Sequence, residues 1–317
     1  MLDVLDKIMM HPRTPRSAAR TVERIVRASK AVRVAQDRAR RRKLVSSVPR
    51  DPKFTNLLDP ARGFGWIPKG TMGAVGPAVA YAQRVLEERR HIQRPRKEGK
   101  QAVEDYLIHL FVPTRYEEAP PLFDLALSNE VLQIATEYLG ELPVLLRVQL
   151  LWSPVNSRLK GSQLYHRDGR HWFQQRVKFI FAANDIDESS GPFTFLPADL
   201  SEQVSKRYDS FRMLDRVKDE DMYRYVSPSD ELQFVGPAGS GLVLDTSRCF
   251  HFGSRTRGKE RLLIMFQFWS PLDLPPGRGV NLLRSPEFTK RFGSDPIHML
   301  LIPDDDKADS PIRIETD

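Results

Sequence analysis

The chain has 317 residues, of which 40% are hydrophobic, so it is long enough to bury a sizeable core in one domain with additions. Its net charge of +8 would suggest a nucleic-acid surface if it were spread evenly, but residues 1–47 hold 13 Lys/Arg against 4 Asp/Glu. The rest of the chain is therefore close to neutral. The sequence contains no run of about 18 apolar residues, so we predict no membrane-spanning helix.

The first predicted element is a basic helical arm, residues 1–47. Pro15 suits a first helical position after Thr14, and apolar side chains between Val22 and Val32 recur at helical spacing, with arginines on the other faces. The simplest interpretation of this amphipathic helix is a solvated basic face. The alternatives are a homodimer contact or an anionic partner such as a membrane surface or an acidic protein; we do not expect nucleic acid.

Two features bear on the compartment. Cys249 is the only cysteine, which excludes an internal disulfide and is typical of a reducing environment. The segment from Met1 to Met10 contains Asp3 and Asp6 and lacks an apolar signal core, so we expect no secretory signal. These features favour the cytoplasm.

Residues 48–144 are expected to form a helical region that packs on the core. An irregular connection rich in proline and glycine is predicted over 47–75, and helices follow at about 78–94, 100–110 and 129–139. Ser128 is a plausible N-cap for the last of these helices, and Gly140 is a plausible residue to end it.

From Leu145 onward, the pattern changes to short strands rich in β-branched and aromatic residues and separated by turn signals. This pattern predicts a sandwich or jelly roll over residues 145–275, with a polar insertion at about 199–232. A C-terminal extension follows at 276–317, and the composition of its tail from Pro303 is typical of disorder. The expected strands are Leu145–Trp152, Gln163–His166, Arg176–Ala183, Pro192–Leu196, Gly241–Leu244 and Arg261–Trp269.

The most informative motif is His166-Arg167-Asp168. Residues two apart in a strand project from one face, so His166 and Asp168 can reach one point in space. A third ligand from a distant strand, His251, would give two imidazoles and one carboxylate, a set that suits non-haem Fe(II) because it leaves positions open for a co-substrate and O₂. The motif alone is short, and a solvated loop pair and a core histidine are the alternative interpretations.

The residues around this motif resemble the phytanoyl-CoA dioxygenase family over about 140–272. The matching runs are His166-Arg167-Asp168-Gly169, Val177 to Asp187, the corner Gly191-Pro192 leading to Pro197, and Gly239 to Asp245 before His251 and Arg261. The resemblance implies a double-stranded β-helix (a jelly roll) that uses Fe(II), 2-oxoglutarate and O₂. It also implies that His166, Asp168 and His251 are the iron ligands.

The resemblance further implies that Arg261 pairs with the distal carboxylate of 2-oxoglutarate, a task that suits the planar guanidinium fork. Lys178 shares strand parity with Ile180 and is a second candidate for the co-substrate, although an outward-facing lysine is the alternative. Ser254 is a third candidate, but relatives more often place the hydroxyl at the position held here by Gly253.

For the substrate, Arg170 and Trp172 are candidates because they follow the metal motif closely; solvent-facing loop residues are the alternative. Arg147, Gln149, Trp152 and Arg170 together suggest a polar mouth for a carboxylated, phosphorylated or CoA-linked molecule.

The sequence therefore predicts an Fe(II)- and 2-oxoglutarate-dependent dioxygenase that oxidises a C–H bond of a small organic substrate, with no catalytic residues beyond the metal ligands. The carboxylate of Asp168 favours hydroxylation, because related halogenases have a small residue there. One alternative is a non-catalytic jelly roll that associates through its basic helix. Another is a cupin-like metalloenzyme that does not use 2-oxoglutarate.

Overall fold

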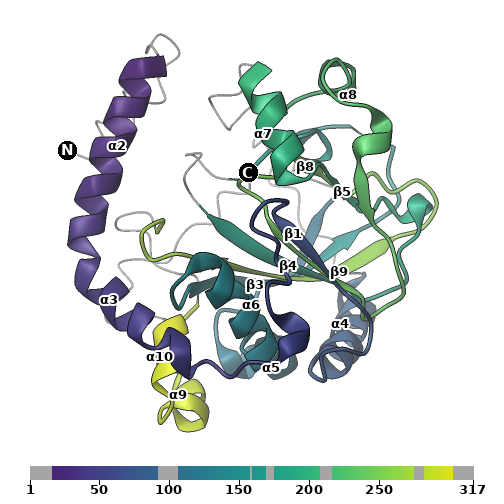
Figure 1. Cartoon of the computed structure of the whole chain (residues 1–317). Helices are drawn as coiled ribbons and strands as arrows, with labels where there is room; N and C mark the ends of the chain where they lie inside the picture. The colour runs from purple at the N-terminus through teal and green to yellow at the C-terminus, as the bar shows by residue number, and fades with distance from the viewer. Residues whose placement is uncertain are drawn as a thin grey trace, which may run out of the picture.

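A computed structural model describes residues 16–91, 106–157, 159–168, 175–207, 216–274 and 282–302. Two antiparallel sheets make up its centre, with helices on the outside (Figure 1). The strands are β1 (Phe64–Ile67), β2 (Ile108–Phe111), β3 (Val144–Ser153), β4 (Arg176–Ala182), β5 (Phe193–Phe195), β6 (Leu232–Phe234), β7 (Gly241–Asp245), β8 (His251–Phe252) and β9 (Arg261–Trp269). The helices are α2 (Arg16–Arg33), α3 (Ala35–Lys43), α4 (Val75–Arg89), α5 (Pro120–Ala126), α6 (Asn129–Leu139), α7 (Ala198–Arg207), α8 (Asp219–Met222), α9 (Pro286–Phe292) and α10 (Pro296–Leu301).

The larger sheet has the strand order β1-β7-β4-β9-β3-β2, and its alternating side chains divide between two cores. On β4, Val177, Phe179 and Phe181 belong to the core that the sheet shares with α4, α5 and α6. Ile180 and Ala182 point the opposite way, into a second core between the two sheets. The larger sheet is therefore the middle layer of the molecule.

The smaller sheet has the strand order β6-β5-β8, and two isolated bridges extend it beyond β8. His166 bridges His251, and Tyr165 bridges Val217 on its other side. At the opposite end of the sheet, β6 approaches β1, because the rings of Phe234 and Trp66 stack with their centroids 6.2 Å apart. The two sheets thus enclose a barrel-like interior, and the expectation of a mainly β fold with helical additions is confirmed.

The α6 helix has the ends that the sequence predicts. The Ser128 hydroxyl accepts a hydrogen bond from the backbone N–H of Val131 at 3.5 Å, and Gly140 ends the helix with φ 69°. The segment predicted as a polar insertion at about 199–232 contains most of α7 and all of α8, which cover the outer side of the smaller sheet through Val204 and Met222.

Two strands of the larger sheet come from the region expected to be helical or irregular, so that prediction is wrong there. β1 lies within the predicted irregular connection and pairs with β7, and β2 overlaps the end of the predicted helix over 100–110 and pairs with β3. Both strands are only four residues long, and their pairing partners are distant in sequence. The predicted strand Gln163–His166 is instead a 3-10 turn over Gly161–Gln163 followed by the two bridges.

The basic arm is anchored through α3. Arg38 Nε donates to the two carboxylate oxygens of buried Glu141 at 3.1 and 2.8 Å, and Arg41 donates to the carbonyls of Leu142 and Pro143. The α2 helix continues from this anchor along the outside of the molecule (Figure 1). None of the described helices combines the length and the apolar character needed to span a membrane.

The apolar side chains of α2 do not share one environment, although their spacing places them on one helix face. Val26 is fully buried, whereas Ile25 is 55% and Val32 is 79% exposed. Lys30 lies one turn after Val26 and is buried with it. The buried side of α2 therefore combines an apolar and a cationic residue.

Candidate metal centre

The polar side chains of the candidate site lie on the inner face of the larger sheet, which is turned toward the smaller sheet. On β9, Leu263 belongs to the core between the sheets, and Arg261 and Gln267 share its parity. On β4, Lys178 shares the parity of Ile180 and therefore faces inward as well, so the alternative of an outward-facing lysine is wrong. The inner face thus carries both apolar and charged residues along the same strands.

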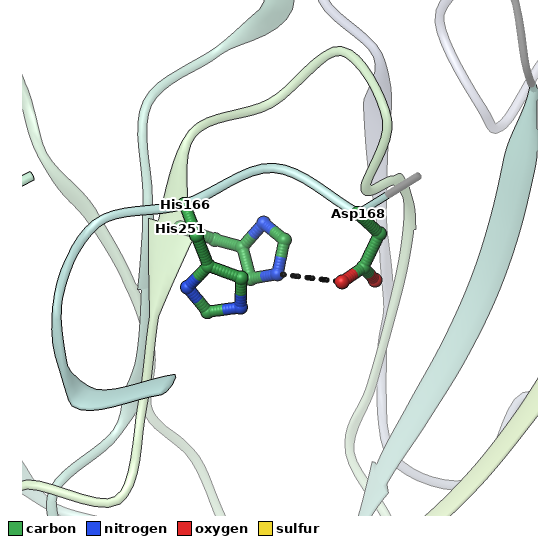
Figure 2. A group of neighbouring side chains, drawn as sticks. All are labelled: His166, Asp168 and His251. Atoms are coloured by element: carbon green, nitrogen blue, oxygen red, sulfur yellow. Dashed lines mark ion pairs between the residues drawn. The ribbon is translucent and has the colours of Figure 1, made fainter. Parts of the chain in front are cut away.

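The three candidate metal ligands come together from two segments that are distant in sequence. The backbones of His166 and His251 exchange hydrogen bonds of 3.0 and 2.8 Å, which sets the two rings side by side with centroids 4.3 Å apart. The backbone N–H of Asp168 donates to the carbonyl of Thr246 at 2.8 Å. Figure 2 shows the carboxylate of Asp168 turned toward the ring of His251, with an Oδ1 to Nε2 distance of 3.9 Å.

Backbone hydrogen bonds also orient the two imidazoles. Nδ1 of His166 lies 2.8 Å from the carbonyl of Leu164, and Nδ1 of His251 lies 2.9 Å from the carbonyl of Cys249. Each Nδ1 therefore carries a proton, and each Nε2 keeps its lone pair for a metal. One nitrogen or oxygen from each of the three residues lies within 4.8 Å of those of the other two.

The electrostatics keep this donor set ready to bind a cation. Burial lowers the pKa of His251 to about 4, against the opposing effect of Asp168, and burial also holds the pKa of His166 well below its ordinary value. Burial alone would raise the pKa of Asp168, but Lys178 and the two histidines outweigh it, so that pKa lies well below its usual range. Both imidazoles are thus neutral and the carboxylate is ionised near neutral pH, as metal coordination requires.

This donor set fits a divalent transition metal. Two neutral imidazole nitrogens and one carboxylate oxygen converge from one side, which is the arrangement that suits non-haem Fe(II) and leaves other coordination positions open. Lys178 holds the second oxygen of the carboxylate, because its Nζ lies 2.6 Å from Asp168 Oδ2. That contact directs Oδ1 toward the histidines.

Arg261 is buried at the far end of the inner face, where no carboxylate of the described residues pairs with it. Its side chain is 2% exposed, and burial alone lowers its pKa to about 9, so it stays charged at neutral pH. Its partners are neutral: Nη1 donates to the carbonyl of Gly191 at 2.5 Å, and Nη2 donates to Ser254 Oγ at 2.8 Å and Ser153 Oγ at 3.3 Å. Nε has no hydrogen-bond partner among the described residues.

The backbone around Arg261 is shaped to admit its guanidinium. A Cβ added to Gly253 would lie 3.3 Å from Arg261 Nη2, and the next residue, Ser254, takes a left-handed φ of 63°. Gly191 has φ 61°, and a Cβ there would meet the backbone N of Thr256 at 2.4 Å. Only glycine fits at this corner, which brings the Gly191 carbonyl to Arg261.

The remaining candidate residues divide into three groups. Arg170 and Trp172 lie outside the described residues. Trp152 shares the outer core and donates its indole N–H to Glu260 at 2.9 Å, so its predicted place in a polar mouth is wrong. Sequence reasoning missed two residues. Ser153 lies opposite Arg261 in the pairing of β3 with β9. Arg216 lies across from His166, because the bridge between Tyr165 and Val217 is antiparallel.

A scan of protein-family models gives no match for this chain, and a search of curated proteins gives none either. Solved structures do match. EctD from S. alaskensis with bound Fe has a TM-score of 0.50 and 13% identity, over 70% of this chain and 78% of that one. The epimerase SnoN in complex with Fe3+, alpha ketoglutarate and nogalamycin RO has a TM-score of 0.45 and 17% identity, over 72% and 93%. AviO1 from Streptomyces viridochromogenes Tue57 has a TM-score of 0.48 and 16% identity, over 72% of this chain and 99% of that one.

The likeness to EctD shows the fold alone, because 13% identity is too low to support a shared function. It confirms the expected jelly-roll core with helical additions, and the two sheets described above are the two halves of that core. Membership of the phytanoyl-CoA dioxygenase family stays a prediction, since no family model matches.

Proposed function

We propose that this protein is an Fe(II)- and 2-oxoglutarate-dependent oxygenase of the hydroxylase type that acts on a small organic substrate. The observation that carries the proposal is the combination of two sites on one interior. His166, Asp168 and His251 offer a metal-binding set, and Arg261 is a buried cation with no carboxylate among the described residues. A dicarboxylate that chelates the metal at one end meets the requirements of both sites.

Each residue has a distinct task under this proposal. His166, Asp168 and His251 hold Fe(II), and Lys178 keeps one oxygen of Asp168 away from the metal. Arg261, with Ser254 and Ser153 beside it, binds the distal carboxylate of 2-oxoglutarate. When bound, iron and 2-oxoglutarate supply the O₂-dependent oxidising power, whereas the chain supplies orientation and exclusion of water.

The experiment is succinate formation from 2-oxoglutarate, measured with Fe(II), O₂ and candidate substrates. We expect the wild-type protein to form succinate and the double variant His166→Ala with Asp168→Ala to form none, because one imidazole cannot hold the metal. The variant His91→Ala removes an exposed histidine and should keep full activity. Turnover that survives in the double variant contradicts the proposal.

Metal analysis of protein purified without air separates the alternatives. A chain that binds no Fe(II) at micromolar metal would be the non-catalytic jelly roll. A chain that binds iron and stays fully active after Arg261→Ala would be a metalloenzyme that does not use 2-oxoglutarate.

We further propose that the protein belongs with the phytanoyl-CoA dioxygenase-like enzymes and acts in the cytoplasm. The sequence motifs support the first proposal, and the single buried Cys249 supports the second.

For the basic arm, we propose association with an anionic partner rather than a homodimer. Exposed arginines accompany the exposed Ile25 and Val32 on α2, and like charges would repel two copies of this helix. Loss of vesicle binding on deleting residues 1–33 would support the anionic partner, and a monomer–dimer change would favour the homodimer.

A further inference from the structure

Asp245 lies at the end of β7, six residues before His251, but its side chain is on the other face of the larger sheet. It pairs with Val177 in the antiparallel register of β7 with β4, and Val177 and Val243 point into the core that the sheet shares with α6. Strand parity sets the side chain of Asp245 on that face as well. It is not one of the possible metal ligands among the described residues, so any effect on the metal must pass through other groups.

The carboxylate of Asp245 is fully buried and accepts hydrogen bonds at both of its oxygens. Oδ2 accepts from the hydroxyl of Tyr138 on α6 at 2.8 Å. Oδ1 accepts from the hydroxyl of Ser247 at 2.5 Å, from its backbone N–H at 3.0 Å and from the backbone N–H of Arg176 at 3.4 Å. Burial raises the pKa of Asp245, and these hydrogen bonds act against that rise. The site therefore suits a group with an acceptor on each side.

These hydrogen bonds help to close the turn between β7 and β8, residues 245–249. The carbonyl of Asp245 accepts from the backbone N–H groups of Arg248 at 3.2 Å and Cys249 at 3.0 Å. Its carboxylate accepts from the backbone N–H of Ser247, in the middle of the same turn. Asp245 therefore holds the 245–249 turn through its main chain and through its side chain.

The 245–249 turn carries two carbonyls that contact two of the candidate metal ligands. The carbonyl of Thr246 accepts from the backbone N–H of Asp168 at 2.8 Å. The carbonyl of Cys249 lies 2.9 Å from Nδ1 of His251. The first contact fixes the backbone from which one ligand extends, and the second fixes the ring orientation and the tautomer of the other. A shift of the turn would therefore move both ligands together.

The turn is also braced from outside by α6 and α7. Nη1 of Arg248 donates to the hydroxyl of Tyr138 at 3.2 Å and to the carbonyl of Pro60 at 2.6 Å. Its Nε and Nη2 donate to Oε1 of Glu202 on α7 at 3.0 and 2.7 Å. The Tyr138 hydroxyl accepts from Arg248 and donates to Asp245, so it links this brace to the buried carboxylate.

We propose that Asp245 is a positioning residue, which holds the 245–249 turn with the help of Tyr138 and thereby fixes the geometry of the metal centre. This inference rests on the proposed function, because the site that is positioned is the proposed iron site. A carboxylate suits the position better than its amide, which has one acceptor atom and one donor atom. In Asp245→Asn, the NH₂ group would face either the donating hydroxyl of Tyr138 or the N–H of Ser247. Either orientation loses a hydrogen bond that holds the turn.

The test is a titration of the metal-free full chain with Co(II) in the absence of air. Co(II) binds nitrogen and oxygen ligands as Fe(II) does, and its visible absorption spectrum reports the coordination geometry. We expect the wild-type protein to bind Co(II), and Asp245→Asn to bind it about tenfold more weakly and with an altered spectrum, because groups that orient metal ligands have effects of this size. Tyr138→Phe keeps the ring and removes only the hydroxyl, so its loss of affinity should be about threefold.

Two control variants separate positioning from a general loss of stability. Glu141 is another fully buried carboxylate, which pairs with Arg38 and has no hydrogen bond to a candidate ligand within the described part of the chain. Glu141→Gln should lower the free energy of unfolding, as Asp245→Asn should, but leave the Co(II) affinity and spectrum unchanged. Tyr81→Phe removes a hydroxyl on α4 that donates to a backbone carbonyl, and it is the corresponding control for Tyr138→Phe.

Failure of the wild-type protein to bind Co(II) contradicts the proposed function. Binding by the wild-type protein, with equal affinity and an unchanged spectrum in Asp245→Asn, overturns the positioning role. An equal loss of affinity in Glu141→Gln overturns it as well, because the effect would then be a general one. If Asp245→Asn does not fold, Tyr138→Phe decides in its place, with Tyr81→Phe as its control and the same two outcomes.

Discussion

The two ends of the barrel interior hold cations in opposite ways. Lys178 at the metal end has a carboxylate partner within the protein, with its Nζ 2.6 Å from Asp168. Arg261 at the other end is more deeply buried, and its partners within the described part of the chain are all hydroxyl or carbonyl groups. A buried charge without a counter-charge costs stability. The fold carries this cost at Arg261, whereas at Lys178 a carboxylate of the chain reduces it. The difference supports the proposal that an anion from outside the chain matches the charge of Arg261.

The largest expected effect is the loss of affinity for 2-oxoglutarate in the variant Arg261→Met. Without the guanidinium, the affinity for 2-oxoglutarate should fall about a thousandfold, or roughly 4 kcal/mol, because two charge-assisted hydrogen bonds are lost. The free energy of unfolding of the ligand-free variant should not fall, because an uncompensated buried charge has been removed. Titration of the metal-loaded protein without O₂ and urea denaturation measure the two quantities.

Arg255 is the matched control for Arg261→Met. It lies in the loop that leads into β9, but it donates to both carboxylate oxygens of Asp219 at 2.7 Å, and it packs over the ring of Phe252. Arg255→Met should therefore lower the free energy of unfolding and leave the affinity for 2-oxoglutarate intact. If both variants behaved alike in either measurement, the contrast between the two kinds of arginine would fail.

The sequence predicts much of this site because strand parity and family-like motifs act over short distances. The shared direction of His166 and Asp168 follows from two residues that are two positions apart, whereas Arg261 enters through the family resemblance and the sequence leaves the direction of Lys178 open. The place of Arg216 does not follow from the sequence, because it lies in a polar insertion with no periodic pattern, and only its bridge to the metal segment gives it a direction. The same holds for β1 and β2, whose short strands are stabilised by partners more than 30 residues away.

The metal end should show a pH dependence that the Arg261 end lacks. The pKa of His251 is about 4 in the folded metal-free protein and about 6.5 when unfolded, so the unfolded chain binds more protons between these values. This group therefore lowers the free energy of unfolding as the pH falls from about 6.5 to about 4, by roughly 3 kcal/mol at most. The variant His251→Gln should lose that part of the pH dependence.

The difference between wild type and His251→Gln is the quantity to measure, by urea denaturation of metal-free protein at several pH values. Burial raises the pKa of Asp273 to about 7, so Asp273 acts in the opposite direction over the same range and cancels in this difference. A difference that does not change between pH 6.5 and 4 would mean that His251 is not held neutral by burial.

The smallest expected effect concerns Ser254, which orients Arg261 from a strained backbone. Ser254→Gly removes the hydroxyl that accepts from Nη2 at 2.8 Å, while glycine adopts φ 63° without strain. The affinity for 2-oxoglutarate should fall about fivefold, near 1 kcal/mol, with no loss of stability. Asn56→Gly relieves the other left-handed non-glycine residue of the described chain, at φ 54°, and should leave the affinity unchanged. Equal 2-oxoglutarate affinity in Ser254→Gly and wild type would show that Ser254 does not orient the guanidinium, and that the carbonyl of Gly191 suffices.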